Sequence, residues 1–274
     1  MRPALLSIIL ASAVTCAFAF SNRLIGTSVN DGASPVSVSR QNYLIAKQPR
    51  LSLAPMMDYT NRHFRAMIRL ISSQTLLYTE MVAVDELLNT RRSDRHHFFD
   101  QSQVIPEGPS VLQLRGNDAS QLFQAARLYR KLSQSGRCKY TSLNVNCGCP
   151  SPSVSGKKCF GAALMNDASH VTKLVRVMRE GSEGELPISI KCRIGIHDES
   201  TAPFSRETYD KLSDEQEYSK LQSFIETIAS DGIVDTFIIH ARIAVLGGDL
   251  SAADNRRIPP LNPDLNFVLK GCIH

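Results

Sequence analysis

The segment 143–165 limits the possible folds of this chain more than any other. Leu143 and Val145 alternate with polar residues, which is the period of a β-strand, and a glycine and a proline then end the strand in a loop. The strand therefore delivers Asn146 and Cys149 to its C-terminal end. In α/β barrels this end of each strand carries the chemistry. A thiol held on such a loop can act as an acid, a nucleophile or a metal ligand.

Several further segments have the same strand-like character, and helical patterns separate them. The expected strands are residues 51–54, 75–79, 110–114, 141–146, 187–192 and 235–240. Polar residues follow every strand, which predicts an α/β fold of the TIM (β/α)8 barrel type, with about six of the eight units present. A doubly wound sheet is disfavoured because the chain has no G-x-G-x-x-G phosphate loop.

The segments between the strands give three more local predictions. Apolar residues at helical spacing predict a helix over 64–71, with Thr60 as its N-cap and its arginines on the solvent side. The polar segment 85–109 predicts a solvated loop. The acidic segment 197–220 predicts a surface insertion that precedes a helix over 221–228.

The formal net charge of +5 comes mainly from the first fifty residues, which carry five basic side chains and one acidic side chain. The remaining 224 residues carry 26 basic and 25 acidic side chains, a net charge of +1. General basicity is therefore no evidence for nucleic-acid binding, and any RNA site has to be a local patch.

The seven cysteines are odd in number and irregularly spaced, which argues against a disulfide framework. No Cys-x-x-Cys or His-x-x-x-His pair completes a tetrahedral zinc site, so we expect no metal. The cysteine pattern favours a reducing compartment.

The N-terminal fifty residues divide into two parts. Residues 1–19 have a charged start, an apolar run and a small-x-small cleavage site, as in a signal peptide, and residues 20–49 are rich in Ser and poor in acids, as in a transit peptide. This combination is similar to the bipartite presequence of secondary plastids, so we expect a plastid protein with no membrane segment after processing. The secretory pathway and the mitochondrion are the alternatives. Residues 50–274 form the barrel domain.

Eight short motifs lie at or near the strand ends and loops of this pattern. They are Ala54–Thr60, Leu77–Met81, Gln113–Gly116, Leu143–Ser151, Phe160–Ala162, Lys191–Gly195, Phe237–Arg242 and Ile258–Leu261. Together these motifs resemble the tRNA-dihydrouridine synthase family, in particular its A-type branch of bacteria and plants, and the resemblance covers about residues 50–265.

The resemblance implies a flavin-dependent enzyme that uses FMN and NADPH to reduce uridine to 5,6-dihydrouridine in the tRNA D-loop, with no stable protein partner. Cys149 matches the family's proton donor. The residues that match FMN contacts are Pro55, Met56, Met57, Gln113, Lys191 and His240. The residues that match tRNA contacts are Asn146, Arg242 and Arg256.

The chain departs from the family pattern in two respects. Basic residues of the family are replaced by Ile243 and Ala253, which should weaken phosphate contacts. The chain also ends after the sixth unit, before the strands that bind the FMN phosphate and before the family's C-terminal helical domain. We therefore expect a C-terminally truncated sequence that binds FMN weakly.

Two other functions stay open at this point. An FMN-barrel oxidoreductase acting on a small molecule would use the same loop around Cys149. A catalytically degenerate barrel that binds RNA without a cofactor would fit the missing phosphate site, although the intact Cys149, Lys191 and His240 oppose it.

Overall fold

The computed structural model describes residues 51–262 except 92, 100–107, 137, 139, 151–159, 200–203, 206–208, 210–213, 248–249 and 252. The expected signal-like segment 1–19 and transit-like segment 20–49 lie outside the described residues. In the part of the chain that is described, no helix is long and apolar enough to cross a membrane.

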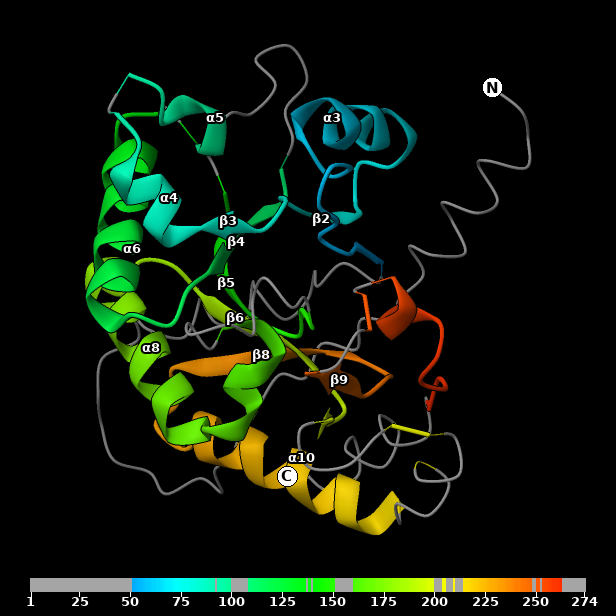
Figure 1. The fold of residues 1–274 in the computed structure, drawn as a ribbon. Helices are drawn as coiled ribbons and strands as arrows, with labels where there is room; N and C mark the ends of the chain where they lie inside the picture. The colour runs from blue at the N-terminus through cyan, green and yellow to red at the C-terminus, as the bar shows by residue number, and fades with distance from the viewer. Residues whose placement is uncertain are drawn as a thin grey trace, which may run out of the picture.

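The main sheet is parallel and curled, with its strands in the order β1-β2-β4-β5-β6-β8 (Figure 1). These strands are β1 (Ser52–Leu53), β2 (Leu76–Tyr78), β4 (Ser110–Arg115), β5 (Ser142–Cys147), β6 (Ile188–Arg193) and β8 (Val234–His240). A short strand, β3 (Val82–Ala83), also pairs with β4, and β7 (Ile196–Asp198) pairs with β9 (Ala244–Leu246) in a separate two-stranded sheet.

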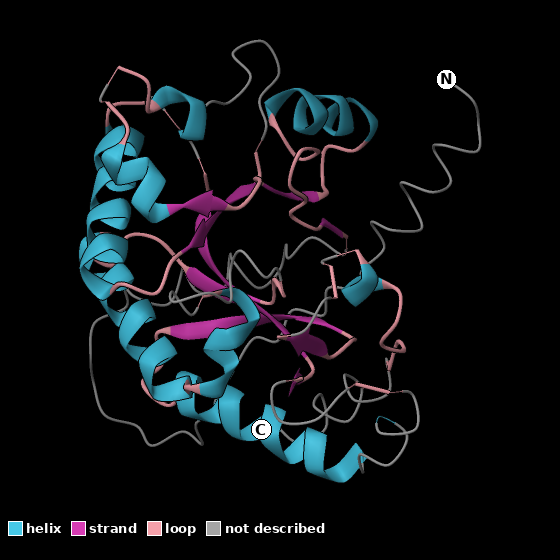
Figure 2. Ribbon diagram, viewed as in Figure 1, coloured by secondary structure: helices cyan, strands magenta, loops and turns pink. Residues whose placement is uncertain are grey.

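Helices cover the outer side of the curled sheet (Figure 2). They are α3 (Arg62–Ile71), α4 (Val84–Asn89), α5 (His96–Phe99), α6 (Ala119–Gln134), α8 (Ala168–Gly181) and α10 (Asp214–Ala229). Two 3-10 helices, η1 (Gly161–Asn166) and η2 (Asp254–Arg256), do not belong to this outer layer (Figure 1). The alternation of parallel strands and outer helices confirms the predicted α/β architecture of the (β/α)8 type, and all six expected strands are present.

Side chains alternate along the strands and sort the two faces of the sheet. On β5, Leu143 and Val145 belong to the apolar core that packs against the helices, together with Ile188 and Ile190 of β6. The intervening positions, such as Asn144, face the barrel interior. The core therefore lies between the sheet and the helices, whereas the interior near the strand ends is polar.

The helix predicted over 64–71 is present as α3, and its Arg62 is exposed as expected. The prediction is wrong for its other two arginines and for its C-terminal apolar residues. Arg65 and Arg69 are buried, whereas Leu70 and Ile71 are about three-quarters exposed. The Arg65 guanidinium donates to the carbonyl of Thr60, and that of Arg69 donates to loop carbonyls such as Thr75. Buried carbonyls that lack a partner are costly, so satisfying them outweighs the apolar periodicity of this helix.

The N-cap of α3 is also different from the prediction. Asn61 caps the helix by accepting from the backbone N–H groups of His63 and Phe64. Thr60 is instead buried, and its hydroxyl bonds to the main chain of Met56.

Two loops predicted from polarity contain regular structure. Segment 85–109 includes most of α4 and all of α5, because Leu87 and Phe99 are buried in the core. Segment 197–220 includes the first turns of α10, which begins at Asp214 rather than near residue 221, and its Glu217 is buried.

Gly181 lets α8 approach α6 closely. A Cβ atom at this position would lie 2.5 Å from the carbonyl oxygen of Phe123. Because that neighbour is backbone, Gly181→Ala should force the helices apart and lower the free energy of unfolding by about 1–3 kcal/mol. Urea denaturation tests this, with the neighbouring exposed Glu180→Ala as the control. Equal midpoints for the two variants would contradict the prediction.

Candidate active site

The register of the parallel strands brings polar side chains into layers on the inner face of the sheet. Gln113, Asn144 and Ser189 are register neighbours on β4, β5 and β6. Asn146 pairs with Lys191 two residues further along, nearer the C-terminal ends of the strands. Arg193 and His240 form the next pair on β6 and β8.

The first layer is joined by hydrogen bonds. The Gln113 side-chain amide donates to Asn144 Oδ1 over 2.7 Å, and Asn144 Nδ2 donates to Ser189 Oγ over 2.9 Å. The Ser189 hydroxyl donates to the Leu143 carbonyl over 3.3 Å. Asn146 joins this layer because its Nδ2 donates to Gln113 Oε1 over 3.0 Å.

Cys149 lies on a loop whose main chain is held at several points. Asn146 Oδ1 accepts from the N–H groups of Gly148 and Cys149 at 3.1 and 3.0 Å. Arg193 Nε donates to the Gly148 carbonyl over 2.9 Å, and the Ala162 N–H donates to the Cys149 carbonyl over 2.9 Å. Few conformations satisfy all of these bonds, so the main chain that carries the thiol is well defined.

Cys149 differs from the other cysteines that the structure describes. It is half-buried, whereas Cys138, Cys147 and Cys192 are buried. Burial raises the pKa of Cys192 to about 12 and that of Cys147 well above its ordinary value. These two thiols face the helices and are structural, which leaves Cys149 as the accessible thiol of the site.

Positive charges gather beside this loop. Burial, and next the charge of Arg193, lower the pKa of Lys191 to about 8. Burial also lowers the pKa of the Arg193 guanidinium to about 10, although the nearby Cys149 thiol opposes this shift. No hydrogen bond joins the Lys191 ammonium to any described residue. A cation that is desolvated and has no hydrogen-bond partner fits an anionic or electron-rich ligand.

His240 is the member of this group that is kept uncharged. Burial lowers its pKa far below the ordinary value, and four neighbouring cations add to the shift: Arg193, Lys191, Arg242 and Arg256. A neutral imidazole offers one donor and one acceptor to a ligand at neutral pH.

The loop after β1 carries Pro55, Met56 and Met57. Its main chain is tied to Thr60, and the Asp58 N–H donates to Glu80 Oε1 over 2.6 Å. Glu80 therefore anchors this loop to the end of β2. Among the described residues, no hydrogen bond joins residues 55–57 directly to Cys149, Lys191 or His240.

The two arginines expected to contact tRNA lie beyond β8. Arg242 is half-buried and donates to the carbonyl of Pro259, and Arg256 is exposed on η2. The buried Asn255 pins η2 to β9, since its side-chain amide accepts from Val245 N and donates to Val245 O. Arg256 is thereby held within electrostatic range of His240.

Sequence reasoning missed four residues of this arrangement: Asn144, Ser189, Arg193 and Asn255. The first three had a usable signal, because they lie at two-residue spacing from Asn146 or Lys191 inside apolar strands. Nothing in the sequence separates Asn255 from an ordinary solvated asparagine.

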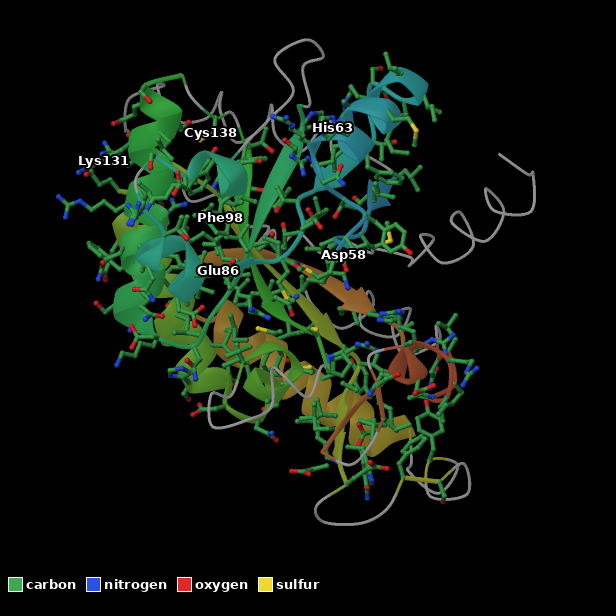
Figure 3. The ribbon with its side chains drawn as sticks, turned by 45° about the horizontal axis from the view of Figure 1, so that its top comes forward. Asp58, His63, Glu86, Phe98, Lys131 and Cys138 are labelled. Atoms are coloured by element: carbon green, nitrogen blue, oxygen red, sulfur yellow. The ribbon has the colours of Figure 1, made fainter. Side chains whose placement is uncertain are left out.

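A cleft of about 650 Å³ lies between α3 and the segment formed by β3, α4 and α5. Figure 3 labels His63 of α3 on one side of this cleft and Glu86 and Phe98 on the other. Met57 and Met81 line it too, so it adjoins the loops after β1 and β2. Sequence reasoning did not predict this concavity. Metal binding has no candidate in the described part of the chain, where no three His, Cys, Asp or Glu side chains cluster.

Comparison with known proteins identifies the family and, through it, the fold. The sequence model of a family described as dihydrouridine synthase (Dus) matches residues 52–268. The chain belongs to this family. It therefore has the TIM-barrel fold of the dihydrouridine synthases, and the layers around Cys149 lie at the C-terminal ends of its strands.

Individual relatives agree with this assignment. The chain is 38% identical over 221 residues to the tRNA-dihydrouridine(20/20a) synthase of Salmonella typhi, covering 81% of this chain and 57% of the relative. It is 38% identical over 235 residues to the Pseudomonas putida protein of the same name, covering 82% of this chain and 60% of the relative. This dihydrouridine synthase chain thus spans somewhat more than half the length of these bacterial-type relatives.

The exposure difference among the described cysteines predicts a difference in reactivity. In the folded protein at neutral pH, iodoacetamide should modify Cys149 at least about tenfold faster than Cys147 and Cys192, because the thiolate is the reactive form and these two thiols are buried. Peptide mass mapping at timed intervals measures the rates. In urea the three rates should converge, and a comparably fast reaction of Cys192 in the folded protein would contradict the prediction.

The neutral state of His240 predicts a pH dependence of stability. Its pKa is near 6.5 in the unfolded chain and far lower in the folded one, so only the unfolded chain takes up this proton between about pH 6.5 and 5. The contribution of the neutral imidazole to the free energy of unfolding is complete above pH 6.5. As the pH falls below this value, the free energy of unfolding decreases by about 1.4 kcal/mol per pH unit. Urea denaturation at pH 7, 6 and 5 should show a shallower loss for His240→Gln. Equal slopes for the two proteins would contradict this.

Proposed function

We propose that this protein reduces uridine to 5,6-dihydrouridine in the D-loop of tRNA, with FMN as cofactor and NADPH as reductant. The observation that carries the proposal is Cys149, an accessible thiol fixed at a strand end above the polar layer of Asn146 and Lys191. Membership of the dihydrouridine synthase family supports the same chemistry.

The residues present fit FMN. Lys191 is a desolvated cation with no hydrogen-bond partner among the described residues, next to Arg193 and the neutral His240. This group would favour an electron-rich ring carbonyl or a phosphate. Gln113 is buried below it and would meet the ring at its edge, while the loop of Pro55, Met56 and Met57 would contact the ring with main-chain atoms.

Bound FMN would supply the hydride that reduces C6 of uracil. Cys149 would hold the proton that C5 receives from the opposite face, acting as a general acid. Asn146 would orient the base. Its amide already bonds to Gln113, Met81 and the Cys149 loop, so contact with uracil requires it to exchange one of these partners or to add a bond.

The base must leave its stack to reach Cys149. Arg242 and Arg256 lie on the rim beyond β8 and are proposed to contact the tRNA backbone there. The Arg242 guanidinium is partly committed to Pro259, which orients it.

The test compares wild-type protein with Cys149→Ala and Cys147→Ala, each with tRNA, NADPH and saturating FMN. Cys149→Ala should lower dihydrouridine formation by at least about 100-fold, because general acids contribute about that factor, and should keep the flavin absorbance. Cys147→Ala removes a buried thiol two residues away and should stay within a few-fold of wild type.

Mass spectrometry of the nucleosides detects the product as uridine with two added hydrogens. Unchanged turnover in Cys149→Ala would refute the assigned proton donor. Flavin absorbance without any tRNA product would favour a reductase of small molecules, and absence of flavin absorbance would favour an RNA-binding remnant.

A further inference from the structure

The hydrogen-bonded chain from Ser189 to Cys149 has a fixed direction. Asn146 Oδ1 accepts from two backbone N–H groups, Gly148 and Cys149, so its Nδ2 must face Gln113. Backbone groups cannot exchange donor and acceptor roles. The orientation of the Asn146 amide is therefore determined at this end.

The orientation then propagates through the buried layer. Gln113 presents Oε1 to Asn146, so its Nε2 faces Asn144 Oδ1, and Asn144 Nδ2 faces Ser189. The Ser189 hydroxyl donates its single hydrogen to the Leu143 carbonyl, so it can only accept from Asn144. This series of hydrogen bonds therefore ends on backbone groups at both sides, and both ends fix the same donor-to-acceptor direction along it.

Burial makes a reversal costly. Asn144 is fully buried, Gln113 is 1% exposed and Ser189 is 7% exposed, so water cannot readily replace a broken bond. If one side-chain amide of this series rotated by 180°, its NH2 group would face another NH2 or N–H donor on one side, and its oxygen would face another acceptor on the other side.

We infer that Asn144 and Ser189 are positioning residues for Cys149, acting through Gln113 and Asn146. Asn144 and Ser189 make no hydrogen bond to the Cys149 loop. They fix the orientation of the Asn146 side-chain amide, whose Oδ1 atom holds the main chain of that loop. The inference rests on the proposed function only where it predicts an effect on the rate of tRNA reduction. The positioning itself concerns the protein without cofactor.

The primary test is hydrogen exchange at the amides of Gly148 and Cys149 in cofactor-free protein. Asn144→Leu removes the acceptor of Gln113 at similar volume and should raise the exchange rate of these two amides, relative to core amides of β4, by about tenfold. Val145→Ala is the matched control. It lies next to Asn144 on the opposite face, in the apolar core, and should leave the ratio unchanged.

Two milder variants guard against loss of folding. Ser189→Ala removes one hydroxyl and should raise the same ratio by a smaller factor. Asn144→Asp keeps an oxygen for Gln113 but removes the amide donor to Ser189 and buries a carboxyl group, so it should raise the ratio by less than Asn144→Leu does. An unchanged ratio in Asn144→Leu and Ser189→Ala, or an equal rise in Val145→Ala, would overturn the inference.

Turnover supplies the second readout. If the proposed function holds, Asn144→Leu should lower kcat by about tenfold with the KM for tRNA within about twofold, because the proton donor moves while the tRNA contacts of Arg242 and Arg256 remain. If neither the wild-type protein nor any variant reduces tRNA, that result would count against the proposed function and not against the positioning role. The exchange ratios would still decide the positioning role.

Discussion

Parallel pairing of β4, β5 and β6 in one register places Gln113, Asn144 and Ser189 side by side inside the curled sheet. Polar groups in such a place must satisfy one another, because desolvation without a partner costs more than a hydrogen bond returns. The resulting network reaches the strand ends through Asn146 and grips the main chain beside Cys149. The placement of the thiol therefore depends on residues buried well below it.

The charges around Cys149 follow a related logic. Lys191, Arg193 and His240 lie on neighbouring inward positions of β6 and β8, where burial disfavours their charged forms. A cluster of this kind carries unfavourable electrostatic energy in the absence of an anionic or electron-rich ligand. That cost is consistent with a site selected for binding rather than for stability, and it supports the proposed flavin cofactor, whose reduced form is anionic.

Much of the fold was predictable because strand patterns are local. The two-residue period of Leu143 and Val145 placed β5 within one residue of its observed start, and the Gly and Pro after it marked the loop of Cys149. The same pattern located the polar residues at the strand ends, whereas the roles expected of Gln113, Asn146, Lys191 and His240 came from the family resemblance. α3 was misjudged because its apolar period was taken to mark the buried face. Arg65 and Arg69 are instead buried, because they bond to carbonyls of the adjoining loops and, in the case of Arg69, to the distant carbonyl of Pro109.

The sequence alone determined the order of the six main strands along the chain and the family to which the chain belongs, and it supplied Cys149 as the candidate thiol. Only the tertiary structure decided which polar residues share a layer, since register between strands depends on pairing across about 30 to 50 residues of intervening chain. Asn144 and Ser189 acquire their role through that pairing. Arg193 and Asn255 do so through contacts with the carbonyls of Gly148 and Val245, which no local pattern encodes. Side-chain period specifies the face on which a residue lies, and three-dimensional packing specifies its partner.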